Sequence, residues 1–207
     1  MTSRGIELVW SGKQAEAESE LPFDSLERSE QCGDPSGGAS GKAPSSMLIH
    51  GDNLLTMRAL SSRLSGAIDL IYIDPPFATG LSYYSQRAVG TASVEQRAYR
   101  DNRARGMHGY LDRMYARFQL MHRLLSDDGK LFVHCDWRAN SMLRLLLDEI
   151  FGAACFRNEI IWRRAPNLGR QAASKQLGRV IDTIFVYSKT AGAEFAGEVP
   201  VRSKPVA

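Results

Sequence analysis

The residues Asp74, Pro75, Pro76 and Phe77 form the pattern in this sequence that is best suited to chemistry. An exocyclic amino group on a nucleobase is a poor nucleophile, because its lone pair is delocalised into the ring. The Asp74 carboxylate and the Pro75 carbonyl can accept the two amino hydrogens, and Phe77 can stack on a base that has left the helix. Taken alone, however, Asp-Pro-Pro is more often a turn that ends a strand.

The segments around this motif predict an α/β fold. The apolar, β-branched run at 68–73 predicts a strand that ends at Asp74, and Asp52 can cap the helix that follows an earlier strand. The other predicted elements are strands at 47–50, 130–135, 158–162 and 180–187, and helices at 110–125 and 141–151. This alternation predicts a mainly parallel sheet with helices on both faces.

The predicted sheet places acidic residues at one edge. Ligands in such sheets bind beyond the carboxyl ends of the strands, where Asp52, Asp74 and Asp136 all fall. Residues 78–109 show no clean periodicity, which predicts a long irregular loop. The sequence therefore predicts a polar rim on the sheet with a long loop beside it.

Charge is distributed unevenly along the 207 residues, whose formal net charge is +3. Residues 1–46 are acidic and rich in Gly and Ser, which predicts a disordered or linker-like N-terminal extension before ordered structure begins at Met47. The segments 87–123 and 157–189 each carry an excess of basic side chains. Two separate basic segments favour a polyanionic partner, although arginine-rich loops are often merely solvated.

Other classes of protein are disfavoured. No apolar run reaches the roughly 18 residues that a membrane span needs, so we expect no membrane partner. Cys32, Cys135 and Cys155 are too widely spaced for a disulfide framework or a zinc site. We therefore expect no metal and a reducing, cytoplasmic location.

Five blocks of the sequence, in the same order, resemble the amino-methyltransferases of bacterial restriction–modification systems. The blocks are 51–55, 71–80, 129–137, 151–162 and 182–189. The resemblance is greatest to the permuted class, in which the catalytic motif precedes the cofactor motif and which includes the modification subunits of type III systems. It extends over residues 47–189.

The resemblance implies a site-specific DNA methyltransferase with a Rossmann-like sheet, which transfers a methyl group from S-adenosylmethionine to adenine N6 in double-stranded DNA. Asp74, Pro75, Pro76 and Phe77 would hold the target base, and the first two would also lie near the methionine end of the cofactor. Transfer would be direct, because no cysteine follows a proline at a suitable place. The adenosine part of the cofactor would be contacted by Asp52, Asn53 and Leu54.

Basic residues are implied to contact the DNA backbone, in a sequence-independent and salt-dependent way. These residues are Arg97, Arg100, Arg103 and Arg105 in the predicted loop, and Arg163 and Arg164 after a strand. The loop tyrosines Tyr83, Tyr84 and Tyr99 could line a base pocket, but loop tyrosines more often simply pack. His134, Cys135 and Asp136 are interpreted as the packed end of a strand with a polar rim, rather than as a nucleophilic or metal site.

The sequence departs from the family pattern at the cofactor motif, a glycine-rich turn after a strand. The nearest string, 195–198, lacks the second glycine. We therefore expect that the strands of the cofactor motif are missing and that the strand at 68–73 has an unpaired edge. The expected domains are 47–190, the catalytic part, and 191–207, a tail or the start of a target-recognition region. A C-terminal half or a complementing subunit would then be needed, besides a restriction subunit as a possible partner.

Alternatives to adenine-N6 methylation stay open. Asp in the first motif position fits adenine-N6 better than cytosine-N4, where Ser often replaces it. Besides the cytosine-N4 reaction, the chain could be an inactive DNA-binding remnant. A third alternative is methylation of an amine or amide on RNA or protein.

Overall fold

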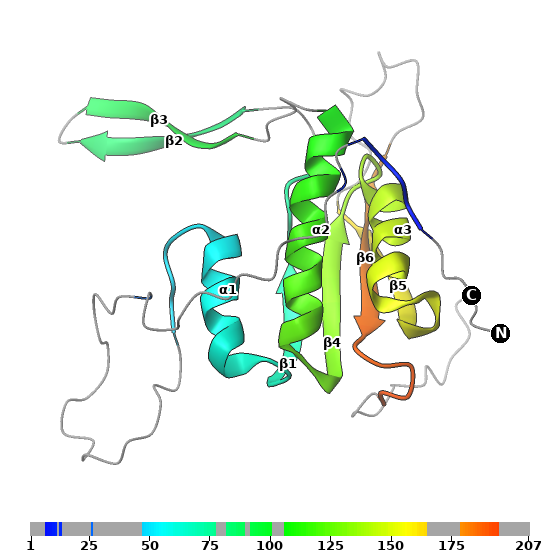
Figure 1. Cartoon of the computed structure of the whole chain (residues 1–207). Helices are drawn as coiled ribbons and strands as arrows, with labels where there is room; N and C mark the ends of the chain where they lie inside the picture. Colours follow the sequence, from blue (N-terminus) through cyan, green and yellow to red (C-terminus); the bar gives the residue numbers. More distant parts are fainter. Residues whose placement is uncertain are drawn as a thin grey trace, which may run out of the picture.

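The structure, a computed structural model, has a four-stranded sheet, a separate two-stranded hairpin and a layer of helices (Figure 1). It describes residues 7–11, 13, 26, 47–77, 106–164 and 179–194, together with the two hairpin strands. The sheet order is β1 (Ile68–Ile73), β4 (Leu125–Cys135), β6 (Ile181–Ser188) and β5 (Phe156–Arg163), and the hairpin pairs β2 (Ser82–Val89) with β3 (Ala92–Arg100). The prediction of an α/β fold is confirmed.

The four-stranded sheet is mixed. Strands β1 and β4 are parallel, whereas β6 is antiparallel to both of its neighbours, β4 and β5. The prediction of a mainly parallel sheet is therefore wrong for the described strands. An apolar run predicts a strand but not its direction, and β6 inserts between β4 and β5 rather than adding to the edge of the sheet.

Three helices are described, and their ends follow local sequence signals. Asp52 caps α1, because its Oδ1 accepts hydrogen bonds from the backbone N–H groups of Leu54 at 2.8 Å and Leu55 at 3.4 Å. Gly152 ends α3 with a φ of 88°, which favours glycine. None of the helices in the described part is long and apolar enough to cross a membrane. The helices are α1 (Asn53–Leu64), α2 (Gly106–Leu124) and α3 (Asn140–Phe151), with a 3-10 turn, η2, at Ala153–Cys155.

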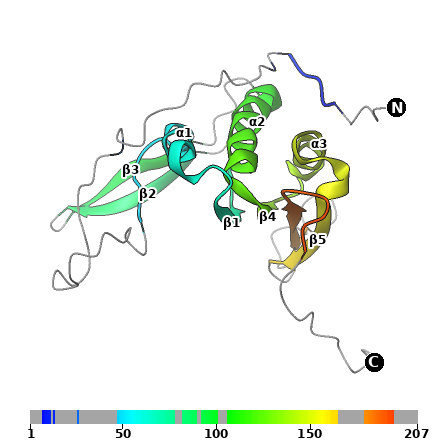
Figure 2. The ribbon, with the colours of Figure 1, turned by 60° about the horizontal axis from the view of Figure 1, so that its bottom comes forward.

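These helices lie side by side on one face of the four-stranded sheet (Figure 2). The prediction of helices on both faces is therefore wrong for the part of the chain that the structure describes. The core lies between the helices and that face, where Leu131 and Val133 of β4 and Tyr187 of β6 are fully buried. The Tyr187 hydroxyl donates to Asp148 Oδ1 of α3 at 2.6 Å, which satisfies both buried groups.

The opposite face of the sheet carries exposed apolar side chains. Leu70 and Tyr72 alternate with the core-facing residues of β1 and are 59% and 55% exposed, and Trp162 of β5 is 56% exposed. Among the described strands β1 pairs with β4 alone, so its other edge is open. This open edge at 68–73 agrees with the expectation from the sequence.

Two predictions about the segments beside β1 are wrong. Residues 47–50 form no strand, and Leu48 is fully exposed, because no described strand lies beside it to pair with. The range 78–109 is not one irregular loop, since β2 and β3 form an antiparallel hairpin within it and α2 begins at Gly106. The two strands are stabilised by pairing with each other, which the periodicity of the sequence did not reveal.

Strand β4 also begins earlier than predicted, at Leu125 rather than Lys130. Its first residue pairs with Ile68 of β1, and Gly129 allows the two strands to approach closely. A Cβ atom at Gly129 would lie 2.8 Å from the carbonyl oxygen of Ile68. The glycine therefore belongs to the strand, not to a turn before it.

The N-terminal residues 7–11 and 13 pack against α2 and α3. Trp10 is buried in the core cluster, and its indole N–H donates to Asp112 Oδ1 at 2.6 Å. Lys13 Nζ pairs with Glu149 Oε1 at 2.5 Å. The prediction that ordered structure begins at Met47 is wrong for these residues. Most of the predicted N-terminal extension, and 195–207 at the other end, lie outside the described residues.

Candidate active site at the ends of β1 and β4

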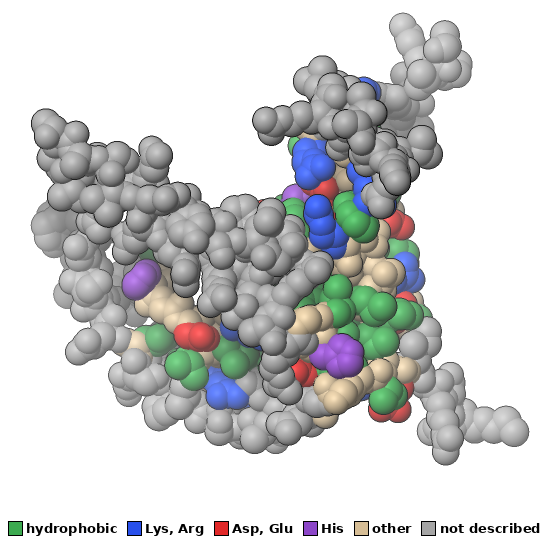
Figure 3. Space-filling model, turned by 90° about the horizontal axis from the view of Figure 1, so that it is seen from above, with side chains coloured by type: hydrophobic (Ala, Val, Ile, Leu, Met, Phe, Trp, Pro, Cys, Tyr) green, Lys and Arg blue, Asp and Glu red, His purple; other side chains and the backbone are tan. Residues whose placement is uncertain are grey.

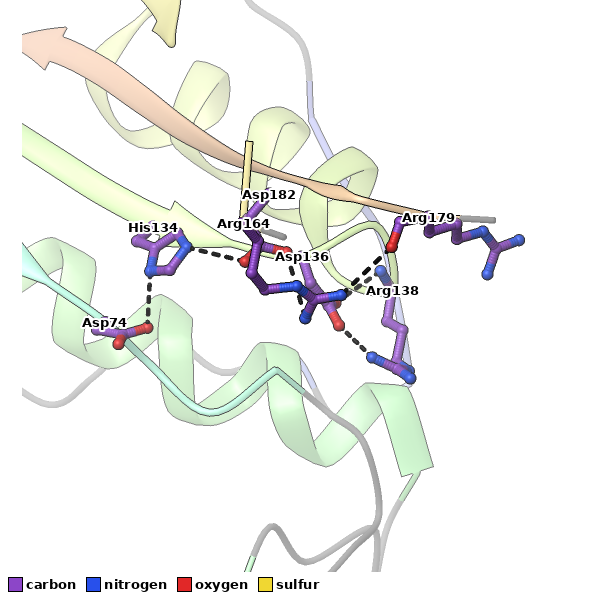
Figure 4. Close-up of polar contacts among 7 residues, drawn as sticks. All are labelled: Asp74, His134, Asp136, Arg138, Arg164, Arg179 and Asp182. Atoms are coloured by element: carbon purple, nitrogen blue, oxygen red, sulfur yellow. Dashed lines mark hydrogen bonds and ion pairs between the residues drawn. The ribbon is translucent and has the colours of Figure 1, made fainter. Parts of the chain in front are cut away.

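The parallel pairing of β1 with β4 brings Asp74 beside His134. Ile73, the last residue of β1, lies opposite Val133, so the next residue of each strand leaves the sheet at the same end. Asp74 Oδ1 lies 3.2 Å from His134 Nδ1 (Figure 4). The Asp74 side chain is 58% exposed. It is therefore accessible to a substrate and is held from one side by a histidine.

The other members of the motif lie beside this pair. Pro75, Pro76 and Phe77 are half-buried and adopt neither helix nor strand. The Phe77 ring meets the His134 ring edge to face, with centroids 5.3 Å apart. An edge-to-face contact is the favoured arrangement for aromatic rings and leaves Phe77 a surface on which a base can stack.

The second nitrogen of His134 faces a buried carboxylate. Antiparallel pairing of β4 with β6 sets Cys135 opposite Thr183, so Asp182 reaches the His134 ring from the start of β6. Asp182 Oδ2 lies 3.5 Å from His134 Nε2, and the Asp182 side chain is 3% exposed. Arg164 Nη1 lies 3.8 Å from the other oxygen of Asp182. Ionisable side chains from the ends of β1, β4, β5 and β6 therefore meet at this end of the sheet.

A basic margin adjoins the site. Arg138 pairs with the buried Asp136 carboxylate, and its backbone N–H donates to Asp136 Oδ1 at 2.8 Å. Trp137 carries the guanidinium of Arg179 at 3.4 Å from its ring centroid and that of Arg138 at 4.9 Å. Figure 3 looks onto this end of the molecule, where Lys and Arg side chains gather beside acidic ones. Arg164 joins this margin, because its guanidinium also donates to the Arg179 carbonyl at 3.5 Å.

The predicted DNA-contacting arginines are described unequally. Arg163 and Arg164 are exposed at the end of β5, next to the site. Arg97 and Arg100 fall on β3, but their side chains lie outside the described residues. Arg103 and Arg105 lie wholly outside, and nothing is described of the side chains of the remaining candidates, Tyr83, Tyr84 and Tyr99.

The predicted adenosine-contacting residues lie at the start of α1 and have a different neighbour from Asp74. Asn53 Oδ1 accepts from Arg117 Nε of α2 at 2.8 Å, and Asp52 Oδ1 lies 3.9 Å from the same guanidinium. The Asp52 side chain is 58% exposed, and Leu54 is half-buried. The start of α1 therefore presents an exposed carboxylate and an amide, and both contact Arg117 of α2.

The surroundings of Cys135 disfavour a reactive thiolate. It is fully buried, and burial, followed by the charges of Asp136, Glu159 and Asp182, raises the pKa of its thiol to about 12. No cluster of metal-ligating side chains occurs within the described ranges. The burial of Cys135 agrees with its interpretation as part of a packed strand end.

That interpretation missed the link from His134 to Asp74 and Asp182. The sequence did contain a signal, because His134 lies near the carboxyl end of one apolar strand and Asp74 follows the carboxyl end of another. Strand order and register were needed to show that these two ends are neighbours.

Residues 68–202 match the model of the N6/N4 methyltransferase family, described as DNA methylase. The chain therefore belongs to this family of DNA methyltransferases. It is 30% identical over 165 residues to the type III restriction-modification enzyme StyLTI Mod subunit of Salmonella typhimurium, covering 73% of this chain and 25% of the relative. It is 34% identical over 141 residues to the type II methyltransferase M.EcaI of Enterobacter cloacae, covering 68% of this chain and 28% of the relative.

Among solved structures, the M1.HpyAVI–SAM complex matches with a TM-score of 0.47 and 14% sequence identity. The match covers 76% of this chain and 62% of that one. The chain spans about a quarter of the length of these two curated relatives. The activities of those whole proteins are therefore not assigned to this chain, but they support a proposal about it.

Proposed function

We propose that this chain provides the catalytic motif of an S-adenosylmethionine-dependent DNA methyltransferase that acts on adenine N6. The observation that supports this most is Asp74, which is exposed at the end of β1 and lies within hydrogen-bonding distance of His134. Membership of the DNA methylase family supports the reaction class. A role on DNA also fits the cytoplasmic location expected from the sequence.

The residues at the end of β1 divide the work of holding the base. The Asp74 carboxylate and the Pro75 carbonyl accept the two hydrogens of the amino group, which returns electron density to the nitrogen and orients its lone pair. Phe77 supplies the stacking surface for the unstacked base. Proximity and orientation supply most of the acceleration, and no covalent bond to the enzyme forms.

The residues present fit one side of an S-adenosylmethionine molecule. The exposed Asp52 carboxylate and Asn53 amide at the start of α1 would bind the ribose and adenine, and the Asp74–Pro75 backbone would bind the methionine end. When bound, this cofactor supplies an electrophilic methyl group on a sulfonium. The basic side chains Arg163 and Arg164 would contact DNA phosphates beside the base.

A second polypeptide, or a further part of the protein, would complete the site. The open edge of β1 and the exposed Leu70 and Tyr72 support this part of the proposal, because such an edge and face bury apolar area when another layer is added. In the names of relatives, the type III restriction-modification enzymes carry Mod subunits. A restriction subunit is accordingly a further candidate partner.

Transfer of labelled methyl groups from S-adenosylmethionine to unmethylated DNA tests the proposal. The chain is assayed alone and with the C-terminal half of a relative added in trans. We expect labelled N6-methyladenine with the added half, and an Asp74→Ala rate lower by about a hundredfold or more. Asp69→Ala is the matched control, because Asp69 lies on the same strand and contacts Ser126 instead.

The outcomes separate the alternatives. N4-methylcytosine among the products would establish the cytosine reaction, and label in RNA or protein would establish a different acceptor. Full activity of the chain alone would contradict the need for a second half. Well-folded protein that binds DNA but transfers no methyl group in either assay would identify a DNA-binding remnant.

A further inference from the structure

His134 lies between two carboxylates that come from opposite neighbours of β4. Its Nδ1 faces Asp74 Oδ1 at 3.2 Å and its Nε2 faces Asp182 Oδ2 at 3.5 Å (Figure 4). The first distance is that of a hydrogen bond, and the second is that of an electrostatic contact. One ring therefore joins an exposed carboxylate at the end of β1 to a buried one at the start of β6.

The three side chains differ sharply in their freedom to move. The Asp182 side chain is 3% exposed, that of His134 is 17% exposed and that of Asp74 is 58% exposed. The Phe77 ring packs edge to face with His134 and restricts it further. The packed His134 ring thus restricts the exposed Asp74 side chain, which would otherwise rotate in solvent.

We propose that His134 is a positioning residue for methyl transfer, which fixes the Asp74 carboxylate through Nδ1, while the ring itself is held by its place on β4 and by the packing of Phe77. This inference rests on the proposed function of Asp74. A carboxylate can only accept hydrogen bonds, so the proposal places a hydrogen on Nδ1, directed at Asp74. Fixing Oδ1 in this way leaves the other oxygen of Asp74 to accept from the amino group of the base.

This arrangement makes a prediction about each nitrogen of the ring. An asparagine at position 134 can place its amide nitrogen near the position of Nδ1, and a glutamine can place its own near the position of Nε2. If the contact to Asp74 is the one that matters, His134→Asn retains it and His134→Gln does not. A merely structural role for the ring would not distinguish the two amides in this way.

The kinetic test uses the complemented enzyme with His134→Ala, His134→Asn and His134→Gln. We expect His134→Ala to lower kcat by about ten- to a hundredfold, because misplacement of a reacting group by about 1 Å has effects of this size. The KM values for DNA and S-adenosylmethionine should stay near those of the unaltered enzyme. His134→Asn should restore most of the lost kcat, and His134→Gln should not. His108→Ala, at an exposed position on α2, is the matched control.

An unchanged kcat in His134→Ala would overturn the proposal, and so would equal rescue by the two amides. Loss through KM alone would also overturn it, because it would assign His134 to binding rather than to the orientation of Asp74.

A second measurement does not depend on activity. The ring nitrogens of the full chain, which has four histidines, are followed by 15N NMR, and the His134 signals are assigned by their loss in His134→Asn. We expect Asp74→Asn to shift the Nδ1 signal and Asp182→Asn to shift the Nε2 signal. An Nδ1 signal that does not respond to Asp74→Asn would overturn the proposal whatever the enzyme does. If the ring responds but the complemented enzyme transfers no methyl group, the contact is supported and the proposed function alone fails.

Discussion

On the face of the four-stranded sheet that carries the helices, Leu131 and Tyr187 are fully buried, whereas on the opposite face Leu70 and Tyr72 expose more than half of their surface. Both faces are apolar and belong to the same strands. The difference lies in what covers them, since α1, α2 and α3 all lie on one side (Figure 2). The described part of the chain therefore builds a core on one face and leaves the other available to a further layer.

The candidate active site lies at the edge of the sheet formed by the carboxyl ends of β1 and β4. Asp182 and His134 are held within the sheet, while Asp74 is exposed. A site of this kind is rigid on its protein side and open on its ligand side. Binding of an additional layer would enclose Asp74 without requiring the packed part to rearrange.

The largest expected effect on stability comes from truncating one of two leucines. Leu146 lies in the helix layer that covers one face of the sheet, and Leu70 lies on the opposite, bare face. Leu146 of α3 is fully buried, so Leu146→Ala should lower the free energy of unfolding by about 2–5 kcal/mol. Leu70→Ala, on the bare face, should lower it by less than about 1 kcal/mol. Urea denaturation of the chain alone measures both. Similar losses for the two variants would show that the bare face is packed in solution.

The second prediction concerns complementation, for which we expect the bare face to matter more than it does for stability. Leu70→Glu should leave the unfolding midpoint of the chain nearly unchanged. It should weaken complementation by an added C-terminal half about tenfold or more, because it places a charge in the proposed contact. Methyl transfer is measured against the concentration of the added half. Glu159→Gln on β5, which removes a charge from an exposed position, serves as a control. Unaltered complementation by Leu70→Glu would contradict docking on this face.

The smallest expected effect is a pH dependence of the helix-covered core. Burial, and secondly the charge of Lys189, lower the pKa of His122 from its ordinary value to about 4. Between this value and about 6.5 the unfolded chain binds a proton that the folded chain does not, so stability falls as the pH falls through this window. His122→Gln should therefore lose less stability than the unaltered chain between about pH 7 and about pH 5.

Urea midpoints at the two pH values measure this difference. His108→Gln, at an exposed position, should behave like the unaltered chain. Equal loss in His122→Gln and in the unaltered chain would show that the buried histidine does not contribute to the pH dependence.

Local sequence signals predicted much of the fold because they act over short distances. The β-branched run 68–73 is β1, and Asp52 caps α1 as its side chain allows. The predicted helix 110–125 is α2 up to Leu124, and Gly152 ends α3. Each of these features depends on the backbone preferences or the periodicity of a few neighbouring residues.

Direction, layering and pairing could not be obtained in the same way. The antiparallel direction of β6, the absence of a described strand at 47–50 and the hairpin of β2 with β3 depend on partners that are distant in sequence. The position of all described helices on one face depends on the handedness and length of the connections. The near-continuous apolar run 68–73 is typical of a strand that is covered on both faces. The run does not show which part of a protein covers each face.

The sequence by itself determined which residues are candidates for the chemistry, because the Asp74-Pro75-Pro76-Phe77 motif and its neighbouring blocks are local strings of residues. The tertiary structure alone decided that His134 lies between Asp74 and Asp182. These three residues are far apart in the chain, and they meet because β4 is parallel to one neighbour and antiparallel to the other. Strand register, which no local pattern encodes, sets the environment of the Asp74 carboxylate.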